Sequence, residues 1–257
     1  MKIARFTVSG GEPRFGIVDE TEIVVLVGDP MFVGYETTEE RVPLDANVKL
    51  LAPVIPRSKV VAVGKNYAEH AAEMGGEAPT TPLIFLKPNT SVIGPGDAIQ
   101  LPRESSQVEH EGELAIVIGS IARDVKKEDY ADVVFGYTIA NDVTARDIQK
   151  ADGQWARAKG YDTFCPLGPV IETEFDFSDA AIEVRVDGEL RQSGNTNQMI
   201  HSIPEIIAFA SSVWTLLPGD VILTGTPAGV GPFVDGQKVE VSIAGLGLLS
   251  NPAKNRA

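Results

Sequence analysis

Two glutamates separated by a single small residue stand at the start of an apolar run. Glu111 and Glu113 flank Gly112, and the run that follows, residues 114–118, is typical of a buried strand. Side chains alternate along a strand, so both carboxylates point to one face. Two like charges on a buried face repel each other and are costly to desolvate. The pair therefore predicts a neighbouring cation, and a hard divalent ion is the simplest candidate.

A third acid, Asp142, ends the strand-like segment 135–142. Three carboxylates with no cysteine or second histidine nearby favour Mg²⁺ or Mn²⁺ over Zn²⁺. Three protein ligands leave about three of roughly six octahedral positions for water or substrate. The alternative is that all three are solvated acids, because an isolated Glu-x-Glu pair is a weak motif.

A histidine and a glutamate lie three residues apart in the helix-like segment 66–74. His70 and Glu73 therefore share one helix face. A carboxylate beside an imidazole fixes its tautomer and makes it a better general base. The segment lies between Gly64 and the pair Gly75–Gly76, so it could move as a lid. The alternative is a surface histidine in a helix ion pair.

Cations at strand ends and turns could supply the positive charge that an acidic substrate needs. They are Lys65, Lys87, Arg146 and Lys159. Lys87 directly follows four apolar strand residues, which suits a buried lysine paired with an acid, although each cation alone could be a surface residue. Thr226 lies in the glycine-rich stretch 224–232, which lacks the lysine of a phosphate-binding P-loop. Its hydroxyls and backbone N–H groups could hold a carboxylate or simply form a tight turn.

Composition limits the classes of partner. The net charge of −14 argues against nucleic acid, and an acidic substrate would need local positive charge against this overall field. The single cysteine, Cys165, cannot form an internal disulfide, and its apolar setting suggests a structural role. No apolar run approaches the ~20 residues of a membrane span, and the N-terminus lacks a signal-peptide core. We therefore expect a cytoplasmic enzyme or binding protein without a membrane partner.

The order of elements predicts a mainly β fold with some helix. Short strands joined by turns fill the first 50 residues, and the prolines of segment 51–56 favour an extended linker. We predict a small β module at 1–55 and a catalytic domain at 56–257. Helices are expected at 66–74 (with Asn66 as its N-cap), 143–155 and 203–215, and a hairpin at Asp187-Gly188. Strands outnumber helices without regular βαβ alternation, which favours an α+β fold over a doubly wound sheet.

Several of these segments together resemble the fumarylacetoacetate hydrolase family over roughly residues 57–251. The shared blocks occur in the family's order, which makes the resemblance specific. They are Gly64-Lys65-Asn66-Tyr67 with His70 and Glu73, Phe85-Leu86-Lys87-Pro88, Glu111-Gly112-Glu113-Leu114, Asn141-Asp142-Val143-Thr144-Ala145-Arg146-Asp147, Ala158-Lys159 with Thr163, and Leu223-Thr224-Gly225-Thr226-Pro227.

This resemblance implies a mixed β-roll that is usually a homodimer. It implies Mg²⁺ or Mn²⁺ held by Glu111, Glu113 and Asp142. His70 and Glu73 become a water-activating pair on a lid that orders over the substrate. The remaining implied roles concern substrate binding and stabilisation of negative charge, and they fall on Lys159, Thr226, Lys87 and Arg146.

The chain resembles the shorter bacterial members of the family. These include isomerases and decarboxylases of homoprotocatechuate breakdown, acylpyruvate hydrolases and oxaloacetate decarboxylases. We expect a small 2-oxo diacid whose 1-carboxylate and 2-oxo oxygen chelate the ion, which stabilises an enolate. The favoured reaction is decarboxylation or isomerisation, of the oxaloacetate or 2-hydroxyhepta-2,4-diene-1,7-dioate type. Acylpyruvate or fumarylpyruvate hydrolysis is the alternative, and a non-catalytic metal-dependent dicarboxylate binder is the alternative of another class.

Overall fold

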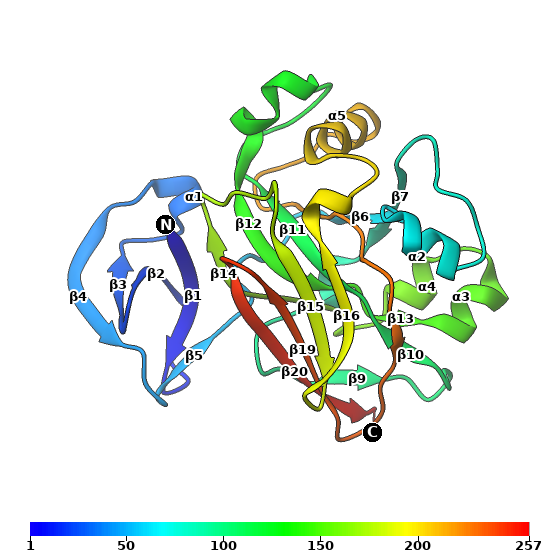
Figure 1. The fold of residues 1–257 in the computed structure, drawn as a ribbon. Helices are drawn as coiled ribbons and strands as arrows, with labels where there is room; N and C mark the ends of the chain where they lie inside the picture. Colours follow the sequence, from blue (N-terminus) through cyan, green and yellow to red (C-terminus); the bar gives the residue numbers. More distant parts are fainter. Residues whose placement is uncertain (257) are drawn as a thin grey trace.

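The computed structural model describes residues 1–256 and is built around a twelve-stranded sheet (Figure 1). Two short strands lie off its main path, since β5 (Val48–Leu50) pairs with β1 and β8 (Val92–Ile93) pairs with β14. Along the path the strand order is β4 (Thr37–Pro43), β3 (Glu22–Leu26), β2 (Arg14–Asp19), β1 (Lys2–Val8), β14 (Cys165–Glu172), β12 (Val134–Asn141), β11 (Gly112–Ile118), β17 (Val221–Leu223), β6 (Val60–Gly64) and β7 (Leu83–Lys87).

Two smaller sheets complete the β structure. The five-stranded sheet has the order β16 (Glu189–Asn195), β15 (Ala181–Val186), β19 (Lys238–Ile243), β20 (Gly247–Asn255) and β9 (Ile99–Leu101). The three-stranded sheet has the order β13 (Thr144–Ala145), β10 (Val108–His110) and β18 (Gly231–Pro232). Asp187 and Gly188 join β15 to β16 with φ of 50° and 84°, as a two-residue hairpin turn requires, so the hairpin prediction is confirmed.

The helices are short and lie at the edges of the sheets. The α-helices are α1 (Pro30–Val33), α2 (Ala68–Glu73), α3 (Arg146–Asp152), α4 (Ala156–Lys159) and α5 (Ile203–Val213), and the 3₁₀ turns are η1 (Asn89–Ser91), η2 (Lys127–Val133) and η3 (Thr196–Gln198). The helices expected at 66–74 and 203–215 are found as α2 and α5. Within residues 1–256, no helix combines the length and the apolar character needed to cross a bilayer.

Two local predictions about helices are corrected. The segment 143–155 is not one helix, because Thr144 and Ala145 pair with β10 as β13 before α3 begins. Asn66 does not cap α2, whose N-cap is Tyr67. The buried Asn66 amide instead donates to the carbonyl oxygens of His201 (3.1 Å) and Thr224 (2.8 Å). These tertiary partners take the side chain away from the helix end.

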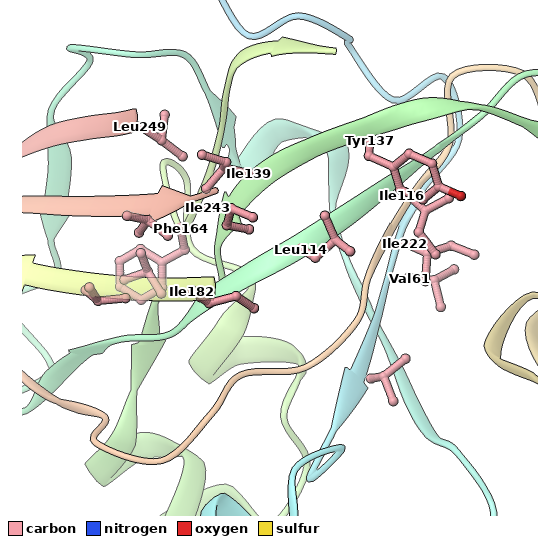
Figure 2. Packing of buried hydrophobic residues seen from close by; sticks show 14 of the residues in the cluster. Val61, Leu114, Ile116, Tyr137, Ile139, Phe164, Ile182, Ile222, Ile243 and Leu249 are labelled. Atoms are coloured by element: carbon pink, nitrogen blue, oxygen red, sulfur yellow. The ribbon is translucent and has the colours of Figure 1, made fainter. Parts of the chain in front are cut away.

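The main core fills the space between the large sheet and the five-stranded sheet. Leu114 and Ile139 from the large sheet meet Ile182, Ile243 and Leu249 from the smaller one (Figure 2). In Figure 1 the yellow and red strands of the smaller sheet accordingly lie across the green β11 and β12. The sheets therefore hold one face of β11 against a packed wall.

Gly112 marks the point of closest approach between these layers. A Cβ at this position would lie 2.4 Å from Val184 Cγ2 and 2.9 Å from Val241 Cγ1. Only glycine fits there without moving the smaller sheet. Because side chains alternate along the strand, Glu111 and Glu113 face away from this wall.

The first five strands extend the large sheet and supply most of a further small core. β1 pairs with β14, with Ile3 opposite Ile171. This small core is separate from the main one and consists of Ala4, Phe6, Ile23, Val25 and Val42 of the N-terminal strands, together with Val170 of β14. The N-terminal strands are thus joined to the rest of the chain by backbone pairing as well as by side-chain packing.

Candidate metal and substrate site

Three buried carboxylates meet where β10, β11 and β12 come together. Glu111 lies between β10 and β11, and Glu113 is in β11. Gly112 pairs with Asn141 of β12, so the next residue, Asp142, lies beside Glu111, and its N–H donates to the Glu111 carbonyl oxygen (2.8 Å). One carboxylate oxygen from each acid lies within 4.8 Å of the others, and each residue is at most 4% exposed. The three predicted ligands therefore form one cluster.

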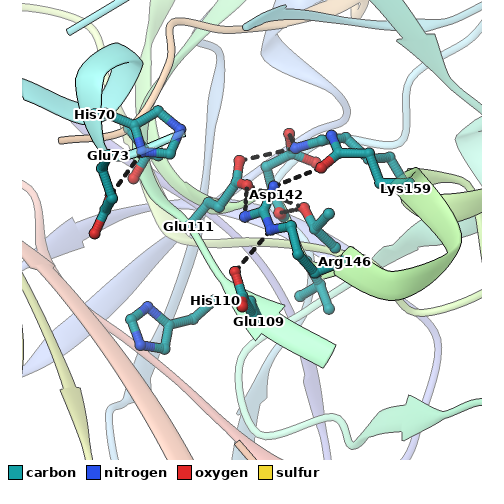
Figure 3. A network of polar contacts seen from close by, with 12 residues as sticks. His70, Glu73, Glu109, His110, Glu111, Asp142, Arg146 and Lys159 are labelled. Carbon is teal, nitrogen blue, oxygen red and sulfur yellow. Dashed lines mark hydrogen bonds and ion pairs between the residues drawn. The ribbon is translucent and has the colours of Figure 1, made fainter. Parts of the chain in front are cut away.

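Cations from three other segments contact two of these carboxylates (Figure 3). Lys159 Nζ lies 2.8 Å from Glu111 Oε2 and 2.5 Å from Asp142 Oδ2. Lys87 Nζ lies 2.6 Å from Asp142 Oδ1, and Arg146 Nη2 lies 2.6 Å from Glu111 Oε1. The expectation of a buried lysine paired with an acid is confirmed for Lys87, which is 1% exposed.

Glu113 differs from the other two acids. Its Oε2 accepts a 2.7 Å hydrogen bond from the Gly225 N–H, and no lysine or arginine among residues 1–256 forms an ion pair with it. Burial, together with the charges of Asp142 and Glu111, raises the pKa of Glu113 well above its ordinary value. Burial also raises the pKa of Glu111, but the charges of Lys159 and Arg146 outweigh it and lower that pKa overall. One buried carboxylate is thus left without a positive partner.

The cluster fits a hard divalent ion. All three groups that converge are carboxylates, the ligands that Mg²⁺ and Mn²⁺ prefer. A bound cation would pair with the Glu113 carboxylate, which no lysine or arginine of the described residues neutralises, and this would favour binding of the ion. Glu111, Glu113 and Asp142 are therefore the residues that could hold it.

The histidine–glutamate pair is formed in α2. His70 Nδ1 lies 3.1 Å from Glu73 Oε2, and His70 is 5% exposed. Glu73 Oε1 also accepts a 3.1 Å hydrogen bond from the Gly229 N–H. Glu73 therefore orients the imidazole and links α2 to the glycine-rich loop after β17.

A cavity of about 180 Å³ brings most of the predicted residues together. Its lining includes His70, Glu111, Glu113, Arg146, Lys159 and Thr226, as well as Lys65 and Trp155. Glu73 lines an adjoining cavity of about 360 Å³, which shares Arg146 with the first. The dimensions suit a small acid.

Lys87 occupies a different position from that expected of a substrate-binding residue. It lines neither cavity, and its ammonium group donates to Asp142 and to the main-chain carbonyl oxygens of Val143 and Lys159. Buried behind Asp142, it is placed to hold that carboxylate. Contact between Lys87 and a molecule in the cavity would require these bonds to break.

Gln192 belongs to the site but was missed in the sequence. Its side-chain oxygen accepts from the Gly112 N–H (3.1 Å) and lies 2.9 Å from His110 Nδ1. Its amide group donates to Thr226 Oγ1 (2.8 Å) and to the Pro227 carbonyl oxygen (2.7 Å). Gln192 therefore ties the carboxylate-bearing strand to the Thr226 loop, and nothing in its own segment of sequence marks this role.

Comparison with known proteins identifies the class. The chain combines mixed sheets, few helices and a buried carboxylate cluster beside a histidine–glutamate pair. Solved structures with this fold include proteins named as an isomerase and a hydrolase of small organic acids. The family model described as fumarylacetoacetate (FAA) hydrolase C-terminal matches residues 59–254, and a model described as Rv2993c-like, N-terminal, matches residues 1–53. The protein belongs to the fumarylacetoacetate hydrolase family.

Three relatives match most of the chain in sequence. Protein Rv2993c of Mycobacterium tuberculosis is 54% identical over 228 residues, which is 88% of this chain and 83% of the relative. Mitochondrial oxaloacetate decarboxylase of Dictyostelium discoideum is 48% identical, covering 73% of this chain and 89% of the relative. Oxaloacetate tautomerase YisK of Bacillus subtilis is 46% identical, and the match covers 80% of this chain and 73% of the relative.

Solved structures confirm the mainly β fold of this family. A 5-carboxymethyl-2-hydroxymuconate delta-isomerase from Mycobacterium smegmatis superposes with a TM-score of 0.92 at 47% identity, over 100% of both chains. A maleylpyruvate hydrolase from Sphingobium sp. SYK-6, in complex with manganese(II) and pyruvate, has a TM-score of 0.83 at 35% identity, again over 100% of both chains. The protein is therefore an enzyme, which argues against the non-catalytic binder.

Proposed function

We propose that the protein is a Mg²⁺- or Mn²⁺-dependent enzyme that decarboxylates or isomerises a small 2-oxo diacid through an enolate. Its substrate is of the oxaloacetate or 2-hydroxyhepta-2,4-diene-1,7-dioate type. The observation that carries the proposal is the buried carboxylate cluster beside a cavity lined by Lys159 and Arg146. The names of the decarboxylase, tautomerase and isomerase relatives support it.

The ion would be held by Glu111, Glu113 and Asp142. When bound, it would supply positive charge that stabilises negative charge on substrate oxygens. The manganese(II) in the maleylpyruvate hydrolase complex supports a hard divalent ion in this fold. Lys87 would keep Asp142 in place through its 2.6 Å ion pair.

The surrounding cations bind and stabilise the anion. Lys159 is fixed by Glu111 and Asp142, so its ammonium group is positioned before an enolate oxygen develops. Arg146 is fixed through Nε by Glu109 (2.7 Å) and would bind a substrate carboxylate at the cavity wall. Thr226 lines the same cavity, but its hydroxyl proton is already donated to the Gly112 carbonyl oxygen. Substrate oxygens are acceptors, so Thr226 would have to turn this proton away from Gly112 to bind one.

His70 is assigned to proton transfer. In isomerisation of a 2-oxo acid it would take a proton from C3, and protonation of the enolate oxygen would complete the step, with Glu73 orienting the ring. With a 2-hydroxydiene it would take the hydroxyl proton, and protonation of a chain carbon would complete the step. In decarboxylation CO₂ leaves as the enolate forms, and no base is needed for that step. Hydrolysis of an acylpyruvate or fumarylpyruvate is the second candidate, because the His70–Glu73 pair is what attack by water on a distal carbonyl requires.

A turnover screen tests the proposal. Oxaloacetate, 2-hydroxyhepta-2,4-diene-1,7-dioate, fumarylpyruvate and acetylpyruvate are compared with Mg²⁺, with Mn²⁺ and with a chelator. We expect turnover of one of the first two to exceed that of both acylpyruvates and to disappear with the chelator. Faster hydrolysis of an acylpyruvate would favour the second candidate, and turnover that survives chelation would contradict the metal assignment.

We further propose that the protein is a homodimer and that residues 1–55 form a module distinct from the catalytic domain at 56–257. Leu83 and Leu86 are each 40% exposed on the edge strand β7 but lie on its opposite faces, so the unpaired edge of the strand is what supports an association surface. The small core that the N-terminal strands form, with Val170 as its one residue from the larger domain, supports the module.

Light scattering on a sizing column tests the homodimer, and a monomer at micromolar concentration would contradict it.

A further inference from the structure

A second cavity lies where the N-terminal strands meet the rest of the large sheet. Its volume is about 400 Å³, against about 180 Å³ for the candidate active site, and the two share no lining residue. One side of it comes from β1, β2 and α1, and the other from the connection 53–57, β12 and β14. Pockets that bind small molecules typically have volumes of roughly 300–1,000 Å³.

Most of the cavity wall is apolar. Side chains from both sides of the seam contribute to it, so a bound molecule would contact the N-terminal strands and the large sheet together. The apolar lining includes Ile3, Phe15, Met31, Val54, Phe135 and Ile171. Such a wall suits an aromatic ring or a short hydrocarbon chain.

Two arginines in the same cavity lack acidic partners. Arg5 makes one long hydrogen bond, from Nη1 to the Ala52 carbonyl oxygen (3.4 Å), and Arg57 stacks with its guanidinium carbon 4.0 Å from the centre of the Phe32 ring. Neither lies within 4.0 Å of a carboxylate oxygen among residues 1–256. Both guanidinium groups are therefore available to an anion in the cavity.

The one carboxylate of the cavity does not neutralise them. Asp29 accepts the Met31 N–H at 3.0 Å as the cap of α1. Burial lowers the pKa of Arg5, and the charge of Asp29 offsets this only in part. The half-buried guanidinium of Arg5 therefore has donors that no described carboxylate accepts.

We propose that this cavity binds a small organic acid that joins one carboxylate to an aromatic ring or a short apolar chain. Arg5 and Arg57 bind the carboxylate, since guanidinium groups match its geometry with paired hydrogen bonds. The apolar part covers the wall formed by Met31 and Phe135. No carboxylate cluster lies here, so the ligand needs no 2-oxo group and the site is separate from the proposed catalytic function.

Methionine methyl resonances can locate the ligand. Of the four methionines in the chain, Met31 lines this cavity and Met74 lines the candidate active site. Phenylacetate, which cannot chelate through a 2-oxo oxygen, is titrated into ¹³C-methyl-methionine protein with Mg²⁺ present. We expect saturable movement of the Met31 resonance while Met74 stays unchanged. The neutral analogue 2-phenylethanol should bind at least about tenfold more weakly, because it cannot form charge-assisted hydrogen bonds.

Variants test the two arginines. Arg57→Gln and Arg5→Gln should each raise the Kd for phenylacetate about tenfold or more. Arg57 is exposed, so its variant decides the question if Arg5→Gln fails to fold. Arg123→Gln is the matched control, since that side chain is 75% exposed beside Asp124 and lines neither cavity, and its Kd should equal that of the wild type.

Four results would overturn the proposal. The first is a Met31 resonance that does not move, or a Met74 resonance that moves in its place. The second is movement of Met31 by 2-phenylethanol at the same concentrations as phenylacetate. The third is equally tight binding of inorganic phosphate, which would indicate a site for any anion. The fourth is wild-type affinity in both arginine variants. None of these depends on turnover, so failure here leaves the catalytic proposal untouched.

Discussion

Replacing Glu113 by glutamine should stabilise the metal-free protein while weakening metal binding. In the wild type this buried carboxylate lies near Glu111 and Asp142 and receives only the Gly225 N–H. Glutamine keeps an oxygen for that N–H and removes the like-charge repulsion, and its amide can donate to the neighbouring acids. Uncompensated buried charges cost several kcal/mol, so a gain of about 1–2 kcal/mol in the free energy of unfolding is expected. For a chain of this size that corresponds to a rise in Tm of roughly 2–8 °C.

With Mg²⁺ bound, the wild type should be more stable to unfolding than Glu113→Gln. A ligand saturated to about 100 times its Kd adds about 2.7 kcal/mol to the free energy of unfolding. Wild type should therefore gain stability with Mg²⁺, whereas Glu113→Gln should bind at least about 100-fold more weakly and gain little, since even the loss of an outer-shell partner typically costs 10–100-fold. Thermal unfolding with a chelator and with increasing Mg²⁺ measures both effects.

Glu109 provides the matched control. It is also a buried glutamate of this region, but Arg146 Nε contacts it at 2.7 Å and Gln107 Nε2 at 2.6 Å. Glu109→Gln should therefore lower Tm with the chelator, because it removes the partner of a buried arginine. If Glu113→Gln instead loses stability in the chelator as Glu109→Gln does, Glu113 is not the unpaired charge. If it keeps wild-type Mg²⁺ affinity, it is not a ligand.

Three further predictions use other parts of the chain. His70→Ala should reduce acylpyruvate hydrolysis about 100-fold or more while oxaloacetate decarboxylation stays within about tenfold, and equal losses in both assays would reject the assigned base. Gln192→Met should lower the free energy of unfolding by about 3 kcal/mol or more in a urea titration, because it strands the buried Gly112 N–H and other groups; an unchanged midpoint would reject its linking role. Burial raises the pKa of Asp220, but hydrogen bonds, first among them that from Lys59 at 2.6 Å, outweigh it and lower the pKa overall. Its contribution to stability is thus complete above the ordinary aspartate pKa and lost as pH falls through the lowered value, so Asp220→Asn should flatten urea stability between about pH 5 and 2.

Local rules predicted the parts of the site that depend on one strand or one helix. Strand alternation placed Glu111 and Glu113 on one face, and helix spacing placed His70 beside Glu73. These rules need only a few adjacent residues, so tertiary packing has little opportunity to override them. The capping rule failed at Asn66 because its amide found partners 135 and 158 residues away.

Partners from distant segments could not be predicted by such rules. Lys87 and Asp142 are 55 residues apart, and Gln192 reaches Gly112 across 80 residues. The pairing of β1 with β14 joins residues near the N-terminus to residues about 170 positions later. Each of these contacts is fixed by how the sheets close on one another, and the sequence reports only that the residues involved can be buried.

The charge balance of the site resolves the conflict between an acidic protein and an acidic substrate. Four buried carboxylates, those of Glu109, Glu111, Glu113 and Asp142, surround three buried cations. The protein alone therefore presents one carboxyl group more than it can pair, and the raised pKa of Glu113 favours a proton on that group. The site then offers a dianion no net positive charge. A divalent ion in place of the proton would leave one net positive charge at the site, in a chain whose net charge is −14. On this account the ion would be needed for the substrate to bind as well as for the chemistry. Glu113 would serve both needs, because its unpaired carboxylate is what favours binding of the ion.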